Sequence, residues 1–139
     1  DLTICENLNH LPRVFFEKRA RAVQGIVKEY DAESLRRTNC VVVSRDRRMI
    51  DAFEKPTRPL TKWRGIGIYI FDHKVFRYVE KTPVNPVRNQ KEITDTLRIM
   101  SRTERVYVVR IHGYNVNVNT LRDLLDANRM VLRLRTAGP

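Results

Sequence analysis

The sequence predicts a single α+β domain over residues 1–139, with a mixed or antiparallel sheet, an N-terminal helix and a C-terminal αβ extension. Three observations favour this class. Segments with the helical spacing of apolar residues alternate with short segments of strand character. A length of 139 residues suits one domain and allows a buried core without disulfides or metals. No repeat, low-complexity tract or long linker divides the sequence.

Three expected elements and one helical turn lie within residues 9–55. Apolar residues recur along one stripe through 9–30, which predicts an amphipathic helix. Asp31 is a favoured helix cap and predicts a short helical turn over 31–37. The apolar run 40–44 predicts a central strand covered on both faces. Ser44 is the expected cap of a second helix, which runs to about residue 55.

The middle of the chain has the pattern of a hairpin. Prolines at 56 and 59 mark a loop. Residues 65–71 and 75–80 then predict two strands, joined by a tight turn at 72–74.

Four further elements follow the hairpin. The spacing at 89–92 is that of a capping box with Asn in place of Ser or Thr, and it predicts a helix that runs to residue 100. A strand is expected over 105–112, followed by a polar loop or short strand at 114–119. Thr120 is expected to cap a short helix. Alternating apolar and basic residues predict a final strand over 129–135.

The expected order of elements is therefore α-β-α-β-β-α-β-α-β, and its middle six follow βαββαβ. Ferredoxin-like folds share this order and have an antiparallel sheet covered by helices on one face. The other face would be open to a ligand. A ferredoxin-like core is thus the expected architecture.

The charge indicates an anionic partner. The formal net charge is +11, and 20 of the 27 basic residues are Arg. A guanidinium presents a planar fork to phosphate oxygens and stacks on bases, whereas an ammonium is a point charge. We therefore expect a non-catalytic protein that binds RNA or DNA through its phosphates, as a viral, regulatory or ribonucleoprotein component. The expected contacts are Arg45, Arg47, Arg48, Arg58, Lys62, Trp63, Arg64, Arg129, Arg133 and Arg135.

Three of these arginines carry a specific argument. Arg45, Arg47 and Arg48 would lie in the first turn of the helix expected over 44–55, where the helix dipole disfavours cations. A bound phosphate would offset this cost, because the helix end and the arginines both attract an anion. Neutralisation by Asp46 and other acids is the alternative.

One segment resembles a known RNA-binding motif. Residues 64–71, Arg-Gly-Ile-Gly-Ile-Tyr-Ile-Phe, are similar to the first ribonucleoprotein motif of RNA-recognition-motif domains. That resemblance implies a sheet surface that stacks bases. Ile66 and Ile68 occupy the two stacking positions, so the residues that stack bases in that family are absent. The chain is therefore not assigned to the family.

Two kinds of nuclease are the alternatives. Asp72-His73-Lys74 after an apolar strand resembles the Asp-x-Lys half of restriction-endonuclease-like nucleases, in which the carboxylate holds a metal. His73 and His112 could instead serve as base and acid in metal-independent RNA cleavage, because imidazole titrates near neutral pH. The balance of these patterns favours no enzymatic activity.

The remaining expectations concern partners and location. A third possible function is a protein-interaction or assembly domain, which would bind an acidic partner through its basic face or form oligomers through an exposed sheet edge. No resident metal or cofactor is expected, since the spacing of His and Cys matches no zinc motif. Neither an apolar segment long enough to span a membrane nor a signal pattern is present. Cys5 and Cys40 are expected to be free thiols. We therefore expect an intracellular location, either cytoplasmic or nuclear.

Overall fold

The computed structural model describes residues 2–5, 8–116, 118 and 120–136, with backbone alone for 2–5, 113–116 and 134–136. The contacts between residues divide the chain into two compact units. The smaller unit combines Asp1–Glu6 with His112–Pro139, and the larger one is Asn7–Ile111.

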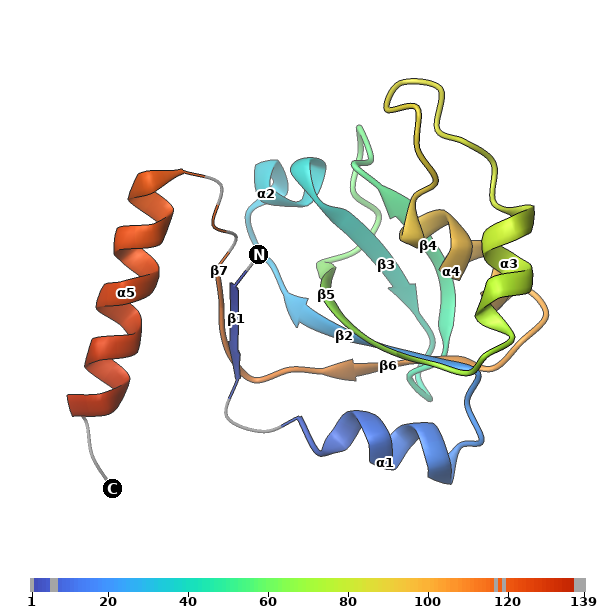
Figure 1. Cartoon of the computed structure of the whole chain (residues 1–139), viewed down its shortest axis with the longest axis horizontal. Coiled ribbons are helices and arrows are strands. Elements are labelled where there is room, and N and C mark those ends of the chain that lie inside the picture. Colours follow the sequence, from blue (N-terminus) through green and yellow to red (C-terminus); the bar gives the residue numbers. More distant parts are fainter. Residues whose placement is uncertain (1, 6–7, 117, 119, 137–139) are drawn as a thin grey trace. The chain divides into compact units, whose positions relative to one another are not determined.

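A five-stranded sheet forms the centre of the larger unit (Figure 1). Its spatial order is β4-β3-β5-β2-β6. Neighbouring strands are antiparallel except β2 and β6, which run parallel, so the sheet is mixed. The strands are β2 (Ala22–Lys28), β3 (Asn39–Val43), β4 (Met49–Glu54), β5 (Trp63–Phe71) and β6 (Val106–Arg110).

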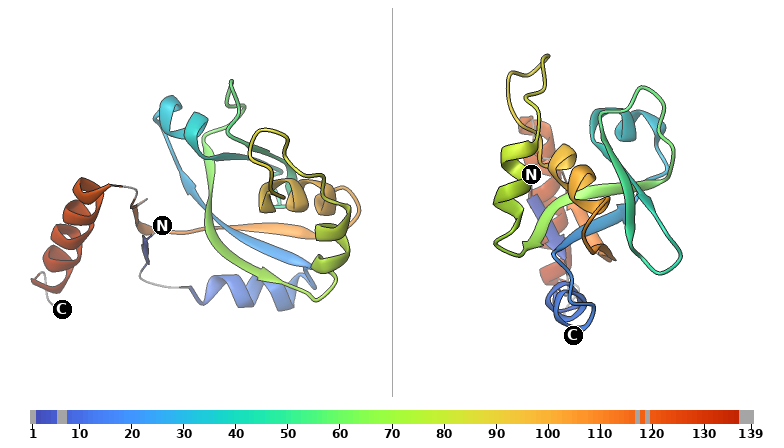
Figure 2. Two further views of the ribbon diagram at one scale, coloured as in Figure 1. Left: turned by 45° about the horizontal axis from the view of Figure 1, so that its top comes forward. Right: turned by 90° about the vertical axis from the view of Figure 1, so that its right-hand side faces the viewer.

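Helices lie on both faces of this sheet, as the two views in Figure 2 show. One face packs against α1 (His10–Glu17), which contacts β2, β5 and β6. The other face packs against α4 (Ile93–Ser101), and α3 (Val75–Lys81) lies beside α4. Leu97 and Met100 of α4 are fully buried against Ala22, Val41 and Val106 of the strands. This second face therefore holds the main hydrophobic core.

The smaller unit contains a two-stranded antiparallel ribbon and a helix. Strand β1 (Leu2–Cys5) pairs with β7 (Gly113–Val116), and α5 (Leu121–Thr136) follows. Thr120 and Asp123 cap α5 reciprocally: the Asp123 N–H donates to Thr120 Oγ1 at 3.2 Å, and the Thr120 N–H donates to Asp123 Oδ2 at 2.9 Å. The predicted cap at Thr120 is confirmed.

The long helix predicted over 9–30 is wrong in its second half. Helix α1 ends after Glu17, and Arg19 adopts the left-handed conformation with φ 46°. The following segment forms β2, whose first five residues are buried. A segment covered on both sides carries apolar residues all round, so the apolar stripe does not separate a helix from a central strand.

The helix predicted over 44–55 is also wrong. Residues 44–48 form a turn and β4 follows. Ser44 Oγ accepts from the Arg48 N–H at 3.0 Å and therefore closes a hairpin turn instead of capping a helix. Arg47 has φ 64°, which no helix interior allows.

Two predicted strands are helices. Residues 75–80, predicted as the second arm of a hairpin, belong to α3, because the Asp72 carbonyl and carboxylate accept from Val75 and Lys74 and start a helical turn. Residues 129–135 belong to α5. Both segments are short and mix apolar with charged residues, a pattern that does not by itself separate helix from strand.

The ferredoxin-like core is therefore wrong, since the βαββαβ order depended on these misassigned elements. The predicted turn capped by Asp31 is confirmed as α2 (Ala32–Arg37), and the strands within 40–44, 65–71 and 105–112 are confirmed. The helix predicted from 89–92 is α4, with Glu92 as its cap and no side-chain capping bond. Within the described part of the chain, no helix has the length and apolar character needed to span a bilayer.

Candidate functional site

A row of residues crosses the sheet on the face that carries α4. Strand register places Asn39 opposite Glu54 and Ile26 opposite both Gly65 and Arg110. Cys40 is opposite Arg64 in the antiparallel β3–β5 pair, so Asn39 faces Gly65. The row therefore runs from Glu54 on β4 to Arg110 on β6, and it is called the polar row below.

Helix α4 contacts the polar row through its first turn. Thr94 is buried, and its Oγ1 donates to Glu54 Oε2 at 2.8 Å. Asn39 Nδ2 lies 3.4 Å from the same Thr94 oxygen. Arg88 Nη1 lies 2.9 Å from Glu92 Oε1 and 3.6 Å from Glu54 Oε1. These contacts hold the carboxylate of Glu54 and the amide of Asn39 in fixed positions.

Two buried amide oxygens at the polar row accept no hydrogen bond from any described residue. They are Gln24 Oε1 and Asn39 Oδ1. Gln24 is 1% exposed, and both amides lie where a side chain at Gly65 would be. A buried acceptor without a donor destabilises a protein by about 1–3 kcal/mol, so the two oxygens are suited to a donor supplied from outside the chain.

Tyr69 and Gly67 border these amides on β5. Burial raises the pKa of Tyr69, the negative charge of Glu54 adds to the rise, and a hydrogen bond from Gln24 opposes it. Gly67 is exposed, and a Cβ atom there would meet no atom within 4 Å. Open space therefore lies next to the polar row, in the segment where β5 departs from regular pairing with β2.

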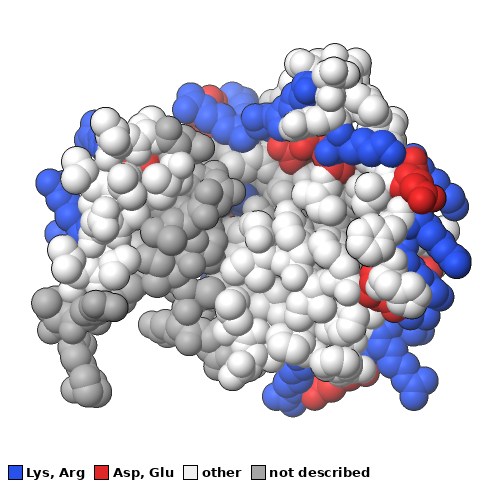
Figure 3. All heavy atoms as spheres, viewed as in Figure 1, with Lys and Arg blue, Asp and Glu red and all other residues white. Residues whose placement is uncertain are grey.

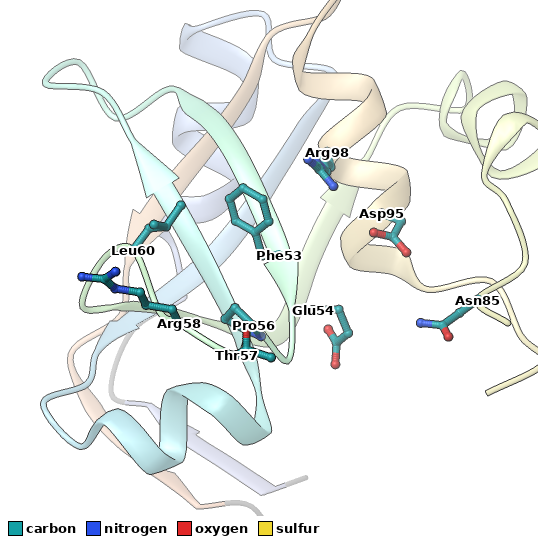
Figure 4. A pocket seen from close by; sticks show the side chains of 9 residues that line it. All are labelled: Phe53, Glu54, Pro56, Thr57, Arg58, Leu60, Asn85, Asp95 and Arg98. Atoms are coloured by element: carbon teal, nitrogen blue, oxygen red, sulfur yellow. The ribbon is translucent and has the colours of Figure 1, made fainter. Parts of the chain in front are cut away.

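Glu54 also lines a pocket of about 360 Å³ at the edge of the sheet (Figure 4). Figure 4 shows Glu54, Asn85 and Asp95 side by side at one end of it, and Phe53 with Leu60 further along. Arg98 lies 4.7 Å from the centre of the Phe53 ring and forms an ion pair with Asp51 at 2.9 Å. The remaining lining residues are Pro56, Thr57 and Arg58.

Cations and aromatic rings gather at the β6 end of the polar row. The Nζ atoms of Lys28 and Lys62 each lie 5.1 Å from the centre of the Tyr30 ring. The guanidinium of Arg110 lies 5.8 Å from the centre of the Trp63 ring. A hydrogen bond with Lys28 is the main cause that lowers the pKa of Tyr30. This cluster, called the basic end, could hold an anionic group beside the row.

The predicted phosphate contacts of the larger unit do not share one location. Arg45, Arg47 and Arg48 lie in the β3–β4 turn, and Arg58 lies in the loop after β4. Lys62 and Trp63 belong to the basic end. Arg64 is 9% exposed, and its Nε lies 3.7 Å from Glu29 Oε2. Its guanidinium therefore forms an ion pair inside the fold and does not face the solvent.

The other three predicted contacts lie on α5 in the smaller unit. Arg129 pairs with Asp126 at 3.4 Å. Arg133 is exposed, and the side chain of Arg135 lies outside the described residues. These residues are on a helix and not, as predicted, on one face of a strand.

Of the predicted nuclease residues, Asp72, His73 and Lys74 lie together just before α3, where His73 Nδ1 is 3.3 Å from Asp72 Oδ1. Asp72 Oδ2 forms an ion pair with Arg21 at 2.6 Å, and its other oxygen accepts from the Lys74 N–H. His73 is exposed in the turn before α3, and His112 belongs to the other unit. The described residues contain no cluster of three or more His, Cys, Asp or Glu that could hold a metal ion.

The basic residues on the face of the larger unit seen in Figure 3 do not form a continuous surface. On the face seen in Figure 3, Lys and Arg lie mainly along the rim with Asp and Glu among them, around an uncharged centre. Several arginines form ion pairs with carboxylates that offset their charge, as Arg98 does with Asp51. The net charge of the sequence therefore does not identify one phosphate-binding surface.

Comparison with known families decides the class of protein. The family model described as nucleotidyl transferase matches residues 1–133. The chain belongs to this family. Among its relatives is the bifunctional protein GlmU of Methanocaldococcus jannaschii, 34% identical over 92 residues, a match that covers 66% of this chain and 22% of the relative. The glucose-1-phosphate adenylyltransferase of Clostridioides difficile is 26% identical over 120 residues, which covers 84% of this chain and 31% of the relative.

Solved structures agree on the fold. An apo UDP-glucose pyrophosphorylase matches with a TM-score of 0.83 at 19% identity, covering 97% of this chain and 52% of the other. A UDP-glucose pyrophosphorylase in complex with UDP-glucose matches with a TM-score of 0.78 at 18% identity, covering 91% and 49%. The fold is thus a Rossmann-like α/β fold with a mixed sheet. The chain spans about half of these structures and between about a fifth and a third of those two curated relatives.

Membership of the nucleotidyl transferase family overturns the predicted function. A non-catalytic nucleic-acid-binding protein, the two nucleases and the assembly domain are wrong as functional classes, and so is nucleic acid as the partner. The viral or regulatory context is wrong too. The high content of arginine does not indicate a polyanionic partner in this chain, because several of the guanidinium groups form ion pairs with carboxylates of the chain itself.

Sequence reasoning missed every residue of the polar row. Asn39 directly precedes the strand predicted over 40–44, Glu54 lies in the helix predicted over 44–55, and Gln24 lies in the helix predicted over 9–30. No function was predicted for any of the three. Gly65 and Gly67 were noted only as part of a motif. The repeated glycines in an otherwise β-branched strand were the available signal, since glycine in a strand often marks a close approach of another group.

Proposed function

We propose that this chain is the sugar-holding part of an enzyme that joins a nucleotide to a sugar 1-phosphate. The observation that carries the proposal is the set of hydrogen-bond acceptors on the polar row: the Glu54 carboxylate and the orphaned oxygens of Asn39 and Gln24. Relatives in the family are named glucose-1-phosphate adenylyltransferase and sugar-1-phosphate nucleotidylyltransferase, which supports this class of substrate.

The chemistry of these atoms selects the sugar and not its phosphate. A carboxylate and an amide oxygen accept hydrogen bonds, so they repel or ignore phosphate oxygens and match the O–H donors of a sugar ring. The open space at Gly67 leaves room for a ring next to the row. The fixed orientation of Glu54 by Thr94 and Arg88 lowers the entropy lost when a hydroxyl binds.

The basic end supplies the complementary charge. Arg110 is the last residue of the polar row on β6, and Lys28 lies on the same sheet face, two residues after Ile26 on β2. In the proposed reaction a phosphate oxygen of the sugar 1-phosphate attacks the α-phosphorus of a nucleoside triphosphate. One P–O bond forms, the bond to the β-phosphate breaks, and pyrophosphate leaves. Cations beside the row would stabilise the sugar phosphate before this attack.

The proposal is tested by calorimetric titration of the chain with glucose 1-phosphate and with UDP-glucose. The variant Glu54→Gln keeps the shape of the side chain and removes its charge. A hydrogen bond to a charged group is worth about 1.5–3 kcal/mol, so the affinity should fall by about tenfold or more. An enzyme that uses a nucleoside triphosphate would act within cells, and this supports the intracellular location predicted from the sequence.

The matched control is Glu80→Gln, which removes the same charge from an exposed carboxylate on α3. It should leave both affinities unchanged. Equal binding of the sugar phosphate by the Glu54 variant and the unsubstituted chain would contradict the assignment of the polar row.

A further inference from the structure

A second pocket, of about 430 Å³, lies where α1 and β5 end and β2 and β6 begin, at the opposite ends of these strands from the polar row. Three arginines, two phenylalanines and one aspartate line it together with Ala20. The lining residues are Phe15, Phe16, Arg19, Ala20, Arg21, Asp72 and Arg105. All of them belong to the larger unit, and the proposed function uses none of them.

The acidic groups at this pocket, Asp72 in its lining and Glu104 beside it, both form ion pairs with Arg21. Arg21 pairs with Asp72 at 2.6 Å and lies 3.7 Å from Glu104. Arg19 and Arg105 form no ion pair with an acidic residue in the part of the chain that the structure describes. The pocket therefore keeps a surplus of positive charge from two guanidinium groups.

Arg19 occupies a backbone position that glycine would fill with less strain. The Ala20 N–H donates to the Phe15 carbonyl at 2.9 Å and the Arg19 N–H donates to the Phe16 carbonyl at 3.1 Å, which is the Schellman ending of a helix. Arg19 is the left-handed residue of this motif, with φ 46°. A side chain there is unfavourable relative to glycine, so the retained guanidinium indicates a use beyond ending the helix.

Arg105 holds Arg19 in this position. Its Nε donates to the Arg19 carbonyl at 3.0 Å, which leaves the terminal nitrogens of both guanidinium groups for another acceptor. Two such groups at one pocket match the oxygens of a phosphate.

Two aromatic rings also line the pocket. The rings of Phe15 and Phe16 meet edge to face with 5.5 Å between their centres. Phe16 is 74% exposed, although an aromatic ring of this size is normally covered. An apolar or planar group bound here would cover it.

We propose that this pocket binds a small phosphate monoester, with its phosphate on Arg19 and Arg105 and an apolar or planar group against Phe16. The proposal concerns binding alone, and it assigns no chemical step to this pocket. The site is independent of the polar row.

The test is the affinity of the chain for phenyl phosphate, inorganic phosphate and phenol, measured by calorimetry. Phenyl phosphate should bind at least several-fold more tightly than inorganic phosphate, because it also covers Phe16, and phenol should not bind measurably. The variant Arg19→Gly should bind phenyl phosphate about tenfold or more weakly. The same variant should unfold at a higher temperature, since it relieves the left-handed strain.

Arg47→Gly is the matched control, because Arg47 is also left-handed, with φ 64°, but does not line the pocket. It should raise the unfolding temperature and leave phenyl phosphate binding unchanged. Glu54→Gln should also leave this binding unchanged, which separates the pocket from the proposed sugar site. Undiminished binding by Arg19→Gly, or equal affinity for phenyl phosphate and inorganic phosphate, would overturn the proposal.

Discussion

Asn39 fills the space that a side chain at position 65 would need. Its Oδ1 lies 2.5 Å from the place where a Cβ atom on Gly65 would stand, and the Gln24 amide crowds the same place. A real Cβ atom does not come this close to another atom, so the two amides of the polar row depend on glycine opposite them. This relationship leads to the first prediction.

Gly65→Ala should destabilise the chain by about 1–3 kcal/mol, the usual range for overpacking a filled interior. Chemical denaturation gives the free energy of unfolding. Gly67→Ala is the control, since its added methyl group would meet no atom within 4 Å, and it should change stability little. Asn39→Ala should restore part of the stability lost by Gly65→Ala, and purely additive effects in the double variant would contradict the packing described here.

Glu54 should control the ionisation of Tyr69. Burial and the negative charge of Glu54 both raise the pKa of Tyr69, so Glu54→Gln should lower that pKa while the contribution of burial remains. NMR titration of the Tyr69 ring signals measures it, and Glu80→Gln should leave it unchanged. Because the pKa is higher in the folded state, the stability that it contributes is present below the ordinary tyrosine pKa of about 10 and is lost as the pH rises through the folded value.

Asp72 should stabilise the chain in the opposite pH direction. Its pKa is lowered, first by the hydrogen bond from the Lys74 N–H and then by Arg21. A carboxyl group with a lowered folded pKa contributes stability above its unfolded pKa of about 4, and the contribution disappears as the pH falls through the folded value. The stability difference between the chain and Asp72→Asn, followed by denaturation at a series of pH values, should shrink as acid is added. A difference that does not depend on pH would contradict this role.

Leu97 should be essential to the core that supports the polar row. It is fully buried on α4, in a core cluster that includes residues of β2, β3, β4 and β6. Leu97→Ala should lower the free energy of unfolding by about 2–5 kcal/mol, because a cavity remains where the side chain was. Leu121→Ala, at a position 82% exposed, is the comparison and should have a small effect.

The sequence predicted the elements that local chemistry determines. Asp31 and Thr120 cap helices as expected, since a cap depends only on its own side chain and the next turn. The apolar run 40–44 became an interior strand for a similar reason. These features need no knowledge of distant parts of the chain.

Elements whose type depends on the rest of the fold were predicted wrongly. Residues 22–28 are a strand because β5 and β6 flank them, although their apolar residues also fit a helical stripe. The polar row could not be predicted from the sequence for the same reason. Asn39, Glu54 and Gly65 lie on three strands, and only their register brings them together.

The most direct test of the sugar site is an NMR titration of the chain with glucose 1-phosphate. The side-chain amide signals of Asn39 and Gln24 and the backbone N–H signal of Gly67 should shift together and saturate at one ligand concentration. Shifts confined to other residues, with these three signals unchanged at saturation, would contradict the account.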